Sequence, residues 1–312
     1  LVRLRWPEQH ARRLSSLNHV ECITSIKELQ SHEGCGLVPT MGALHRGHCS
    51  LIEQMRTHTD DVVVSIFVNP AQFNDSADLE RYPRTLEKDL AAAEAAGATA
   101  VFAPEVETIY PESGTWQPPL PDVATSPHLE DACRPGHFAG VCKVVARLFD
   151  LARPSLSIFG EKDWQQLAVL EAMVAGHGDR WPGLRILRAP TVREDGGLAM
   201  SSRNALLGEE ERERALGIIR AFQAALLVQA ETRVERINDV ESAMHEVLAE
   251  HELAIEYAVI RDETTLEPLG WRDESCSGPI WGDGMRLLIA ARVGQVRLID
   301  NHRADCSEIH PI

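Results

Sequence analysis

The sequence predicts an α/β fold built on a doubly wound parallel sheet, and three observations lead to it. Short apolar segments alternate with helix-like segments from about residue 36 to residue 189, which is the pattern of parallel strands joined by helices. Residues 61–68 (DVVVSIFV) form a continuous run typical of a strand buried on both faces. Polar clusters follow three predicted strand ends, after Val38, Val68 and Phe159. Because ligands bind beyond the carboxyl ends of such strands, we expect these clusters to face one pocket.

The elements of this first part are expected in the following order. The predicted strands are 36–38, 61–68, 99–103, 156–159 and 184–189. The predicted helices are one ending near 59, then 85–96, 140–151 and 165–175. Residues 69–83 and 104–135 are expected to be loops, and the Arg-rich residues 1–20 an extension or a leading helix.

The character of the chain changes after residue 190. A polar, Gly-rich stretch (191–204) precedes two predicted helices, 209–229 and 240–251, and three predicted strands, 255–260, 286–291 and 296–300. This pattern indicates a smaller α+β domain over residues 190–312 that folds as a lid over the first domain, residues 1–189. Residues 272–283 carry Ser, Gly, Pro and acidic residues and are expected to form a loose surface insertion.

Composition narrows the class of protein. The 31 basic and 47 acidic residues give a net charge of −16, which argues against a nucleic-acid or anionic-membrane surface. No apolar run reaches the roughly 18 residues of a transmembrane helix, and the first residues lack the apolar core of a signal peptide. The seven cysteines are scattered with no CxxC, which favours reduced thiols in a cytoplasmic protein over a disulfide framework or a zinc site.

The most informative string is PTMGALHRGH, residues 39–48. A strand end, a turn and a helix start follow one another, and the helix start offers backbone N–H groups to a phosphate. His45 and His48 are three residues apart and share a helix face, so they add donors for charge that develops on that phosphate. The pattern predicts attack on the α-phosphate of a nucleotide. A surface histidine pair or half of a metal site is the alternative.

The other clusters are weaker when each is taken alone. Gln72 offers a donor and an acceptor to a small polar substrate, or it is an ordinary loop glutamine. Lys162 suits a phosphate and Asp163 a ribose hydroxyl or magnesium, although Asp163 also fits the N-cap of a helix. Gln166 is placed to face the same pocket as Gln72. Arg203, in the loop at 200–204, suits a triphosphate, but such loops are often only solvated.

Six strings in this order resemble the signatures of the pantoate–β-alanine ligase family of adenylate-forming nucleotidyltransferases, whose core is Rossmann-like. They are PTMGALHRGH (39–48), VSIFVNPAQF (64–73), RYPRT (81–85), RPGHFAGV (134–141), FGEKDWQQL (159–167) and MSSRN (200–204). The resemblance covers about residues 20–302. It implies that ATP and (R)-pantoate give pantoyl adenylate and diphosphate, and that β-alanine then displaces AMP to form pantothenate.

The resemblance also implies roles for individual residues. His48 matches the donor to the departing phosphate, and Lys162, Ser202 and Arg203 match groups that act with His45 and His48 on the phosphates. Gln72 and Gln166 match pantoate ligands, and Asp89 matches a position near magnesium. The matched ATP-binding residues are Met41, Gly42, Ala43, Leu44, His45, Arg46, Gly47, His48, Gly160, Glu161, Lys162, Asp163, Val192, Met200, Ser201, Ser202 and Arg203. The family further implies a homodimer.

The chain departs from the family pattern at a few positions. Arg46 stands where the family often has an acidic or small residue, Cys49 replaces an apolar residue, and Cys142 and Lys143 replace a small hydroxyl pair. Lys143 either points inward and alters substrate fit or points outward into solvent. Two other functions remain open: nucleotide transfer to a phosphate ester, against which the uncharged Gln72 and Gln166 argue, and a binding protein without turnover.

Overall fold

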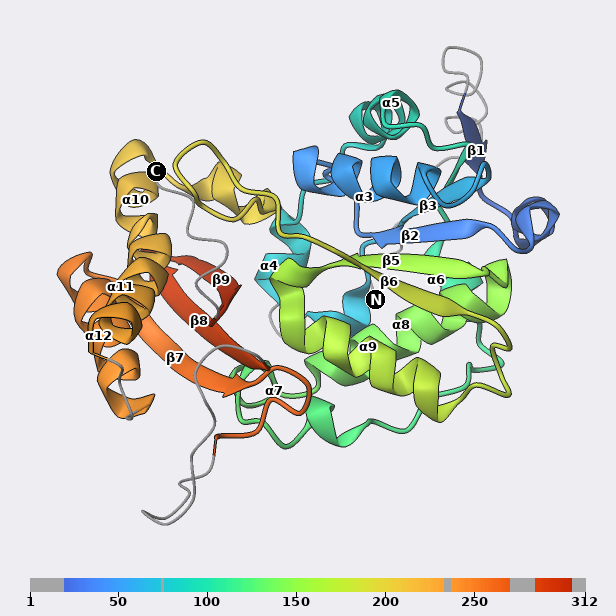
Figure 1. Cartoon of the computed structure of the whole chain (residues 1–312). Helices are drawn as coiled ribbons and strands as arrows, with labels where there is room; N and C mark the ends of the chain where they lie inside the picture. Colours follow the sequence, from blue (N-terminus) through green and yellow to red (C-terminus); the bar gives the residue numbers. More distant parts are fainter. Residues whose placement is uncertain (1–19, 74–75, 233–236, 270–283, 305–312) are drawn as a thin grey trace. The chain divides into compact units, whose positions relative to one another are not determined.

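The computed structural model describes residues 20–73, 76–232, 237–269 and 284–304, and the chain forms two compact units (Figure 1). The first unit consists of Leu1–Thr125, Glu130–Glu161 and Val169–Pro190, and the second of Ser126–Leu129, Lys162–Ala168 and Thr191–Ile312. A domain boundary after residue 189 therefore leaves two short segments of the second unit, Ser126–Leu129 and Lys162–Ala168, on the side of the first. The predicted insertion at 272–283, the extension at 1–19 and residues 305–312 lie outside the described residues.

The first unit contains a six-stranded parallel sheet in the order β1-β4-β3-β2-β5-β6. Its strands are β1 (Glu21–Ile23), β2 (Gly36–Thr40), β3 (Val62–Ile66), β4 (Ala100–Phe102), β5 (Leu156–Gly160) and β6 (Arg185–Ala189). The chain moves outward from β2 through β3 to β4 and then returns to the other side of β2 for β5. Doubly wound sheets bind ligands at such a reversal of strand order, which here lies at the carboxyl ends of β2 and β5. The predicted fold class is confirmed.

Helices cover this sheet in the first unit, as Figure 1 shows. The longer helices are α3 (Arg46–Arg56), α5 (Leu86–Ala95), α8 (His137–Ala152) and α9 (Trp164–Gly176), whose first residues belong to the second unit. The shorter ones are α2 (Ile26–Leu29), η1 (Gln30–His32), η2 (Pro70–Gln72), α4 (Ser76–Arg81), α6 (Val106–Ile109), η3 (Asp122–Ala124), α7 (Glu130–Cys133) and η4 (Glu161–Asp163). The expectation of plain loops at 69–83 and 104–135 is therefore wrong, because each range contains short helical turns.

Close packing against the sheet explains one glycine at the start of β2. A Cβ on Gly36 would lie 2.5 Å from the Met55 sulfur and 2.7 Å from a Thr59 methyl. The absence of a side chain therefore lets α3 approach β2, and Met55 is fully buried there. That contact fixes the turn before α3 relative to the sheet.

The second unit is the predicted α+β domain. Its antiparallel sheet has the order β7-β8-β9, formed by Ala254–Asp262, Met285–Val293 and Val296–Arg303. Its helices are η5 (Ser202–Leu206), α10 (Glu209–Ala215), α11 (Gly217–Thr232) and α12 (Ile237–Glu250). The single helix expected at 209–229 is two helices, because α10 ends at Ala215, with Leu216 as its C-cap, before α11 begins at Gly217. In the described part of the chain, no helix combines the length and the apolar character that a membrane span requires.

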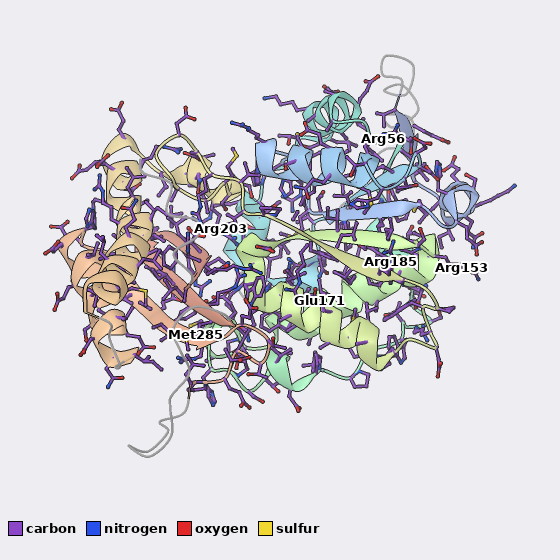
Figure 2. The ribbon with its side chains drawn as sticks, in the orientation of Figure 1. Arg56, Arg153, Glu171, Arg185, Arg203 and Met285 are labelled. Atoms are coloured by element: carbon purple, nitrogen blue, oxygen red, sulfur yellow. The ribbon has the colours of Figure 1, made fainter. Side chains whose placement is uncertain are left out.

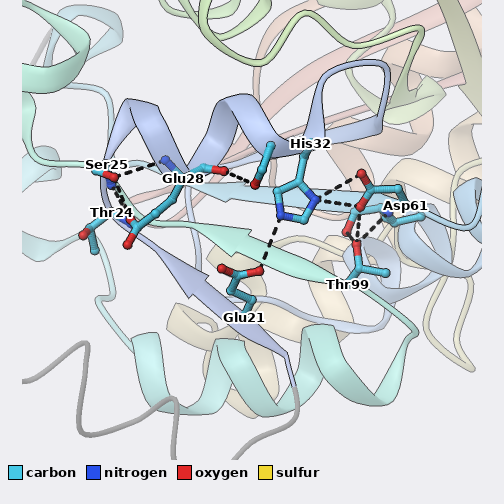
Figure 3. A network of polar contacts seen from close by, with 9 residues as sticks. Glu21, Thr24, Ser25, Glu28, His32, Asp61 and Thr99 are labelled. Atoms are coloured by element: carbon cyan, nitrogen blue, oxygen red, sulfur yellow. Dashed lines mark hydrogen bonds and ion pairs between the residues drawn. The ribbon is translucent and has the colours of Figure 1, made fainter.

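The amino ends of the strands carry a polar network (Figure 3). His32 Nδ1 lies 2.8 Å from Asp61 Oδ1, and His32 Nε2 lies 3.6 Å from Glu21 Oε2. The Thr99 hydroxyl donates to Asp61 Oδ1 at 2.7 Å. Figure 2 shows Arg153 and Arg185 at this same edge of the sheet. These contacts join the segments that precede β2, β3 and β4, so they stabilise the sheet at the edge opposite the carboxyl ends of β2 and β5.

Candidate active site

The turn between β2 and α3 has a backbone that a buried carboxylate holds in place. Gly42 and Ala43 have φ values of 82° and 51°, and for alanine this left-handed conformation is strained. Asp89 Oδ2 accepts from the Ala43 N–H at 3.0 Å, and Asp89 Oδ1 accepts from the Leu44 N–H at 2.7 Å. These charge-assisted bonds compensate for the strain. The turn therefore presents the start of α3 in one conformation.

Two histidines cap α3 reciprocally. The Gly47 N–H donates to His45 Nδ1 at 3.1 Å, and the His45 N–H donates to His48 Nδ1 at 3.4 Å. The two rings stack with their centroids 4.0 Å apart. Because each Nδ1 accepts a backbone hydrogen bond, each neutral ring carries its proton on Nε2. Both histidines are therefore oriented as hydrogen-bond donors at a helix N-terminus, which suits a phosphate.

The structure shows that Asp89 braces this turn. Its side chain is 2% exposed, and besides the two backbone bonds the Thr85 hydroxyl contacts both carboxylate oxygens at 3.3 Å. A magnesium ion takes oxygen ligands in a near-octahedral shell and would have to share these oxygens, so the position of Asp89 near magnesium stays a prediction. Among the described residues, no group of three or more His, Cys, Asp or Glu is arranged to hold a metal ion.

Gln72 lies beside the histidine turn, as the sequence predicted from the neighbouring strand ends. Its Nε2 donates to Met41 Sδ at 3.1 Å, and its Oε1 accepts from Asn69 Nδ2 at 3.0 Å. Asn69 is 1% exposed and also caps η2 by accepting from the Ala71 N–H at 3.1 Å. The turns after β2 and β3 thus meet at Met41 and Gln72.

Helix α8 supports the Gln72 turn from beneath. A Cβ on Gly140 would lie 2.2 Å from the Ala71 carbonyl oxygen, so only glycine permits this approach. Asn69 Nδ2 donates to the Gly140 carbonyl at 3.1 Å, and His137 Nδ1 lies 3.1 Å from the Gln72 carbonyl. Arg134 Nη1 lies 3.0 Å from His137 Nε2. The string RPGHFAGV therefore positions the Gln72 turn.

The end of β5 is open on the side where a Cβ would project. No protein atom lies within 4 Å of the Cβ position of Gly160, so the protein's own packing does not require glycine there, and the backbone is accessible to a ligand. The chain then enters the second unit, where Lys162 Nζ lies 3.7 Å from Asp163 Oδ1. Asn301 Nδ2 on β9 donates to the Lys162 carbonyl at 2.8 Å. This bond fixes the Lys162 backbone to the small sheet.

The remaining predicted nucleotide residues lie together in the second unit. The Met200 N–H donates to the Val192 carbonyl at 2.9 Å, beside a bridge between Arg193 and Ala199. Ser201 caps η5 by accepting from the Arg203 N–H at 3.3 Å. Ser202 and Arg203 are half-buried, and Figure 2 labels Arg203 on this turn. A hairpin therefore places the Val192 segment next to the MSSRN string.

Buried contacts hold this hairpin. Arg193 forms a bidentate ion pair with Asp300 on β9, with distances of 2.6 and 3.2 Å. Asn204 is 3% exposed and donates to Glu194 Oε1 at 2.8 Å. Arg212 in turn contacts Glu194. The string MSSRN thus combines three half-buried polar residues, Ser201, Ser202 and Arg203, with a structural anchor at its last residue.

Sequence reasoning missed several supporting residues. Asn69, Tyr110 and His137 contact the Gln72 turn but were not assigned individually, although Asn69 and His137 lie inside recognised strings. Tyr110 lies outside every string and is far from Asn69 in the chain. Gln166 is half-buried near the start of α9 in the second unit. Its pantoate contact stays a prediction.

Comparison with known proteins decides the family. The model of the pantoate-beta-alanine ligase family matches residues 14–303. This chain belongs to the pantoate–β-alanine ligase family.

The relatives cover nearly the whole chain. The pantothenate synthetase of Phocaeicola vulgatus is 45% identical over 295 residues, which are 90% of this chain and 98% of that protein. The pantothenate synthetase of Geobacter sulfurreducens is 46% identical over 275 residues, covering 87% and 91% of the two chains. A Thermus thermophilus pantothenate synthetase structure has a TM-score of 0.81 at 40% identity, covering 92% of this chain and 100% of that one.

One further ligase structure of the family carries ligands. The Francisella tularensis pantoate-beta-alanine ligase was solved in complex with beta-gamma ATP and beta-alanine. It has a TM-score of 0.70 at 29% identity and covers 91% of this chain and 98% of that one. Family membership therefore explains why the histidine turn, the Gln72 turn and the end of β5 occur in one chain.

Proposed function

We propose that this chain is an ATP-dependent ligase that condenses (R)-pantoate with β-alanine to give pantothenate, AMP and diphosphate. The observation that carries the proposal is the reciprocal cap of His45 and His48, whose Nε2 donors lie at the start of α3 next to the Met41–Gln72 contact. Hydrogen-bond donors for a phosphate therefore lie close to a turn suited to a small polar acid, both within the first unit.

The first step joins pantoate to the nucleotide. A carboxylate oxygen of pantoate attacks the α-phosphorus of ATP, the bond to the bridging oxygen breaks, and diphosphate leaves with its electron pair. His48, assisted by His45, stabilises charge on the departing phosphate through Nε2–H. Lys162, Ser202 and Arg203 are assigned to the remaining phosphate charge, and Gln72 and Gln166 to pantoate.

The second step consumes the pantoyl adenylate. The amine of β-alanine attacks the acyl carbon, AMP leaves, and the new amide loses a proton. The assigned nucleotide contacts, Gly160 to Asp163, Val192 and Met200 to Arg203, hold AMP in place during this step. Enclosure of the adenylate would protect it from hydrolysis; the lid role of residues 190–312 stays a prediction.

Three further expectations accompany the reaction. Magnesium would arrive on the ATP phosphates; the position of Asp89 near it stays a prediction, and no step above depends on that contact. A homodimer is expected from the family resemblance and a cytoplasmic location from the scattered cysteines, and both stay predictions.

Product formation tests the proposal directly. With ATP, magnesium and (R)-pantoate we expect diphosphate release limited to about one equivalent of enzyme, and with β-alanine we expect multiple turnovers that yield AMP and pantothenate. Gln72→Ala should raise the KM for pantoate more than the KM for ATP, whereas the exposed Gln30→Ala should change neither. Turnover with a phosphate ester in place of pantoate, or no turnover at all, would contradict the proposal.

A further inference from the structure

Lys143 is one of the positions at which the chain departs from its family, and the structure shows what it contacts. Its Nζ lies 4.9 Å from the centroid of the Tyr110 ring. The side chain is half-buried, and within the described part of the chain no ion pair forms with it. The Lys143 side chain is thus neither fully buried nor fully solvated, and its charge lies against an aromatic ring.

Tyr110 connects the Lys143 charge to the Gln72 turn. Its hydroxyl donates to Asn69 Oδ1 at 2.7 Å, and its ring lies edge-to-face against Phe67, the residue that follows β3 by one position. Burial raises the pKa of the phenol, so the hydroxyl keeps its proton and remains a donor over the working pH range. The cation above the ring holds the phenol in place and favours donation.

The direction of these bonds fixes the amide of Gln72. Asn69 Oδ1 accepts from Tyr110 and from the Ala71 N–H, so its Nδ2 must face Gln72 Oε1 and the Gly140 carbonyl. Gln72 Oε1 is then an acceptor inside the turn, and Nε2 is directed toward Met41. Thioether sulfur is a weak acceptor. Gln72 therefore presents N–H donors, which match the carboxylate and hydroxyl oxygens of a hydroxy acid.

We propose that Lys143 and Tyr110 are positioning residues that fix the donor polarity of Gln72 through Asn69, and so set the affinity for pantoate. Without the phenol donor, only the Ala71 N–H and the Gly140 carbonyl hold the Asn69 amide, so it is fixed less firmly in the orientation that donates to Gln72 Oε1. A Gln72 amide that is held less firmly presents its N–H donors to the substrate oxygens for less of the time, which weakens pantoate binding. This inference rests on the proposed function, because it assigns Gln72 to pantoate.

Helix α8 supplies both parts of this arrangement from one face. Gly140 and Lys143 are three residues apart and share that face; Gly140 contacts the Gln72 turn and Lys143 contacts Tyr110. The relay is the series of contacts from Lys143 through Tyr110 and Asn69 to Gln72, and a shift of α8 would move both of its ends together. The helix thus couples the position of the Gln72 turn to the orientation of the Asn69 and Gln72 amides.

Steady-state kinetics with matched variants test the relay. Tyr110→Phe should raise the pantoate KM by roughly two- to tenfold, the value of one hydrogen bond, and leave the ATP KM unchanged. Lys143→Met should raise the pantoate KM by about two- to fivefold, and Lys143→Arg should restore it because the cation is retained. The exposed Lys27→Met is the control, and thermal melts verify that each variant folds.

A double-mutant cycle distinguishes positioning from separate structural effects. If Lys143 acts through Tyr110, Lys143→Met should add little to Tyr110→Phe, because the coupling is already lost. Independent, multiplicative effects, or a Lys143→Met pantoate KM equal to that of the Lys27→Met control, would overturn the inference.

A binding measurement separates the failure of this inference from the failure of the proposed function. Calorimetric titration of pantoate, with a non-hydrolysable ATP analogue bound, should show the same order of affinities as the KM values. A wild-type chain that binds pantoate but makes no AMP would refute the ligase and still measure the relay. A wild-type chain that binds no pantoate would overturn both.

Discussion

The two edges of the six-stranded sheet both carry histidine and aspartate side chains, but the hydrogen-bond partners of these side chains differ. At the amino edge, the nitrogens of His32 face the carboxylates of Asp61 and Glu21. At the carboxyl edge, Nδ1 of His45 and of His48 accepts from backbone N–H groups. Two carboxylates engage the His32 imidazole at the amino edge, whereas the His45 and His48 imidazoles at the carboxyl edge are oriented as hydrogen-bond donors through Nε2.

The aspartates differ in the same way. Asp61 bridges two side chains, His32 and Thr99, and lies near the surface. Asp89 is buried and holds two backbone N–H groups of a strained turn. Residue type therefore does not identify the active edge. What distinguishes the edges is the hydrogen-bond partner: His32 and Asp61 contact side chains, whereas His45, His48 and Asp89 accept from backbone N–H groups.

The largest expected difference between the edges is at the histidines. His48→Ala should lower kcat by roughly a hundredfold or more, because it removes a donor aimed at the departing phosphate. His32→Ala, the matched change at the amino edge, should leave kcat within about twofold. Initial rates of AMP formation measure both. Equal losses in the two variants would remove the distinction between the edges.

Asp89→Asn tests the buried carboxylate. The amide can accept only one of the two backbone N–H groups, so one is left without its partner, at a cost of about 1–3 kcal/mol. We expect kcat to fall roughly tenfold or more and hydrogen exchange at Ala43 and Leu44 to accelerate. The exposed Asp60→Asn is the control.

Magnesium dependence decides between the two roles of Asp89. If the carboxylate braces the turn, the magnesium concentration for half-maximal rate should be the same in Asp89→Asn and wild type. A several-fold rise in that concentration, with activity recovered at high magnesium, would instead support the role expected from the family resemblance.

Gly140→Ala probes how closely the carboxyl edge is packed. The added methyl would meet the Ala71 carbonyl at 2.2 Å, so we expect the free energy of unfolding to fall by about 1–3 kcal/mol and the pantoate KM to rise. Gly176→Ala, near the end of α9 with open space around its Cβ position, is the matched control. Denaturant titration and pantoate kinetics give the two readouts, and an unchanged pantoate KM would separate the helix from substrate binding.

His32→Ala should affect stability instead of turnover. The Asp61 and Glu21 carboxylates are partly exposed, so solvent screens the lost pairing and we expect a loss of about 1 kcal/mol. Thermal and urea unfolding measure this loss. No change in stability would show that the amino-edge network does not contribute measurably.

The sequence predicted the parts of the site that follow from local pattern. Strand and helix periodicity placed the turn at 41–48, the Gln72 turn and Gly160 at strand ends, and the helix start placed His45 and His48. The short edge strand β1 (Glu21–Ile23) was missed, because three residues that pair only with β4 carry little periodicity. The break at Leu216 was missed for a related reason, since apolar spacing continues through it.

Contacts between residues far apart in the chain could not be predicted from the sequence pattern. The family resemblance placed Asp89 near magnesium, and local pattern could not show that its carboxylate accepts from the N–H groups of Ala43 and Leu44, more than forty residues away in the chain. Tyr110 and Asn69 are joined across a similar separation. Such contacts depend on how strands are ordered in the sheet, and no local spacing encodes them.

The smallest expected effect is one for which the two edges should behave alike. Burial raises the thiol pKa of Cys35, near the amino edge, and of Cys142, on α8, to about 12 in each case, with the Asp61 charge a second cause for Cys35. A folded thiol that keeps its proton stabilises the fold below its unfolded pKa of about 9, and this contribution is lost as pH rises toward 12. The free energy of unfolding should therefore decline between pH 9 and 12.

Urea titrations across that range should show a shallower decline in Cys142→Ala and in Cys35→Ala than in wild type. The exposed Cys133→Ala should match the wild-type slope. A change in slope for only one of the buried cysteines would show that the edge, and not burial, controls these thiols.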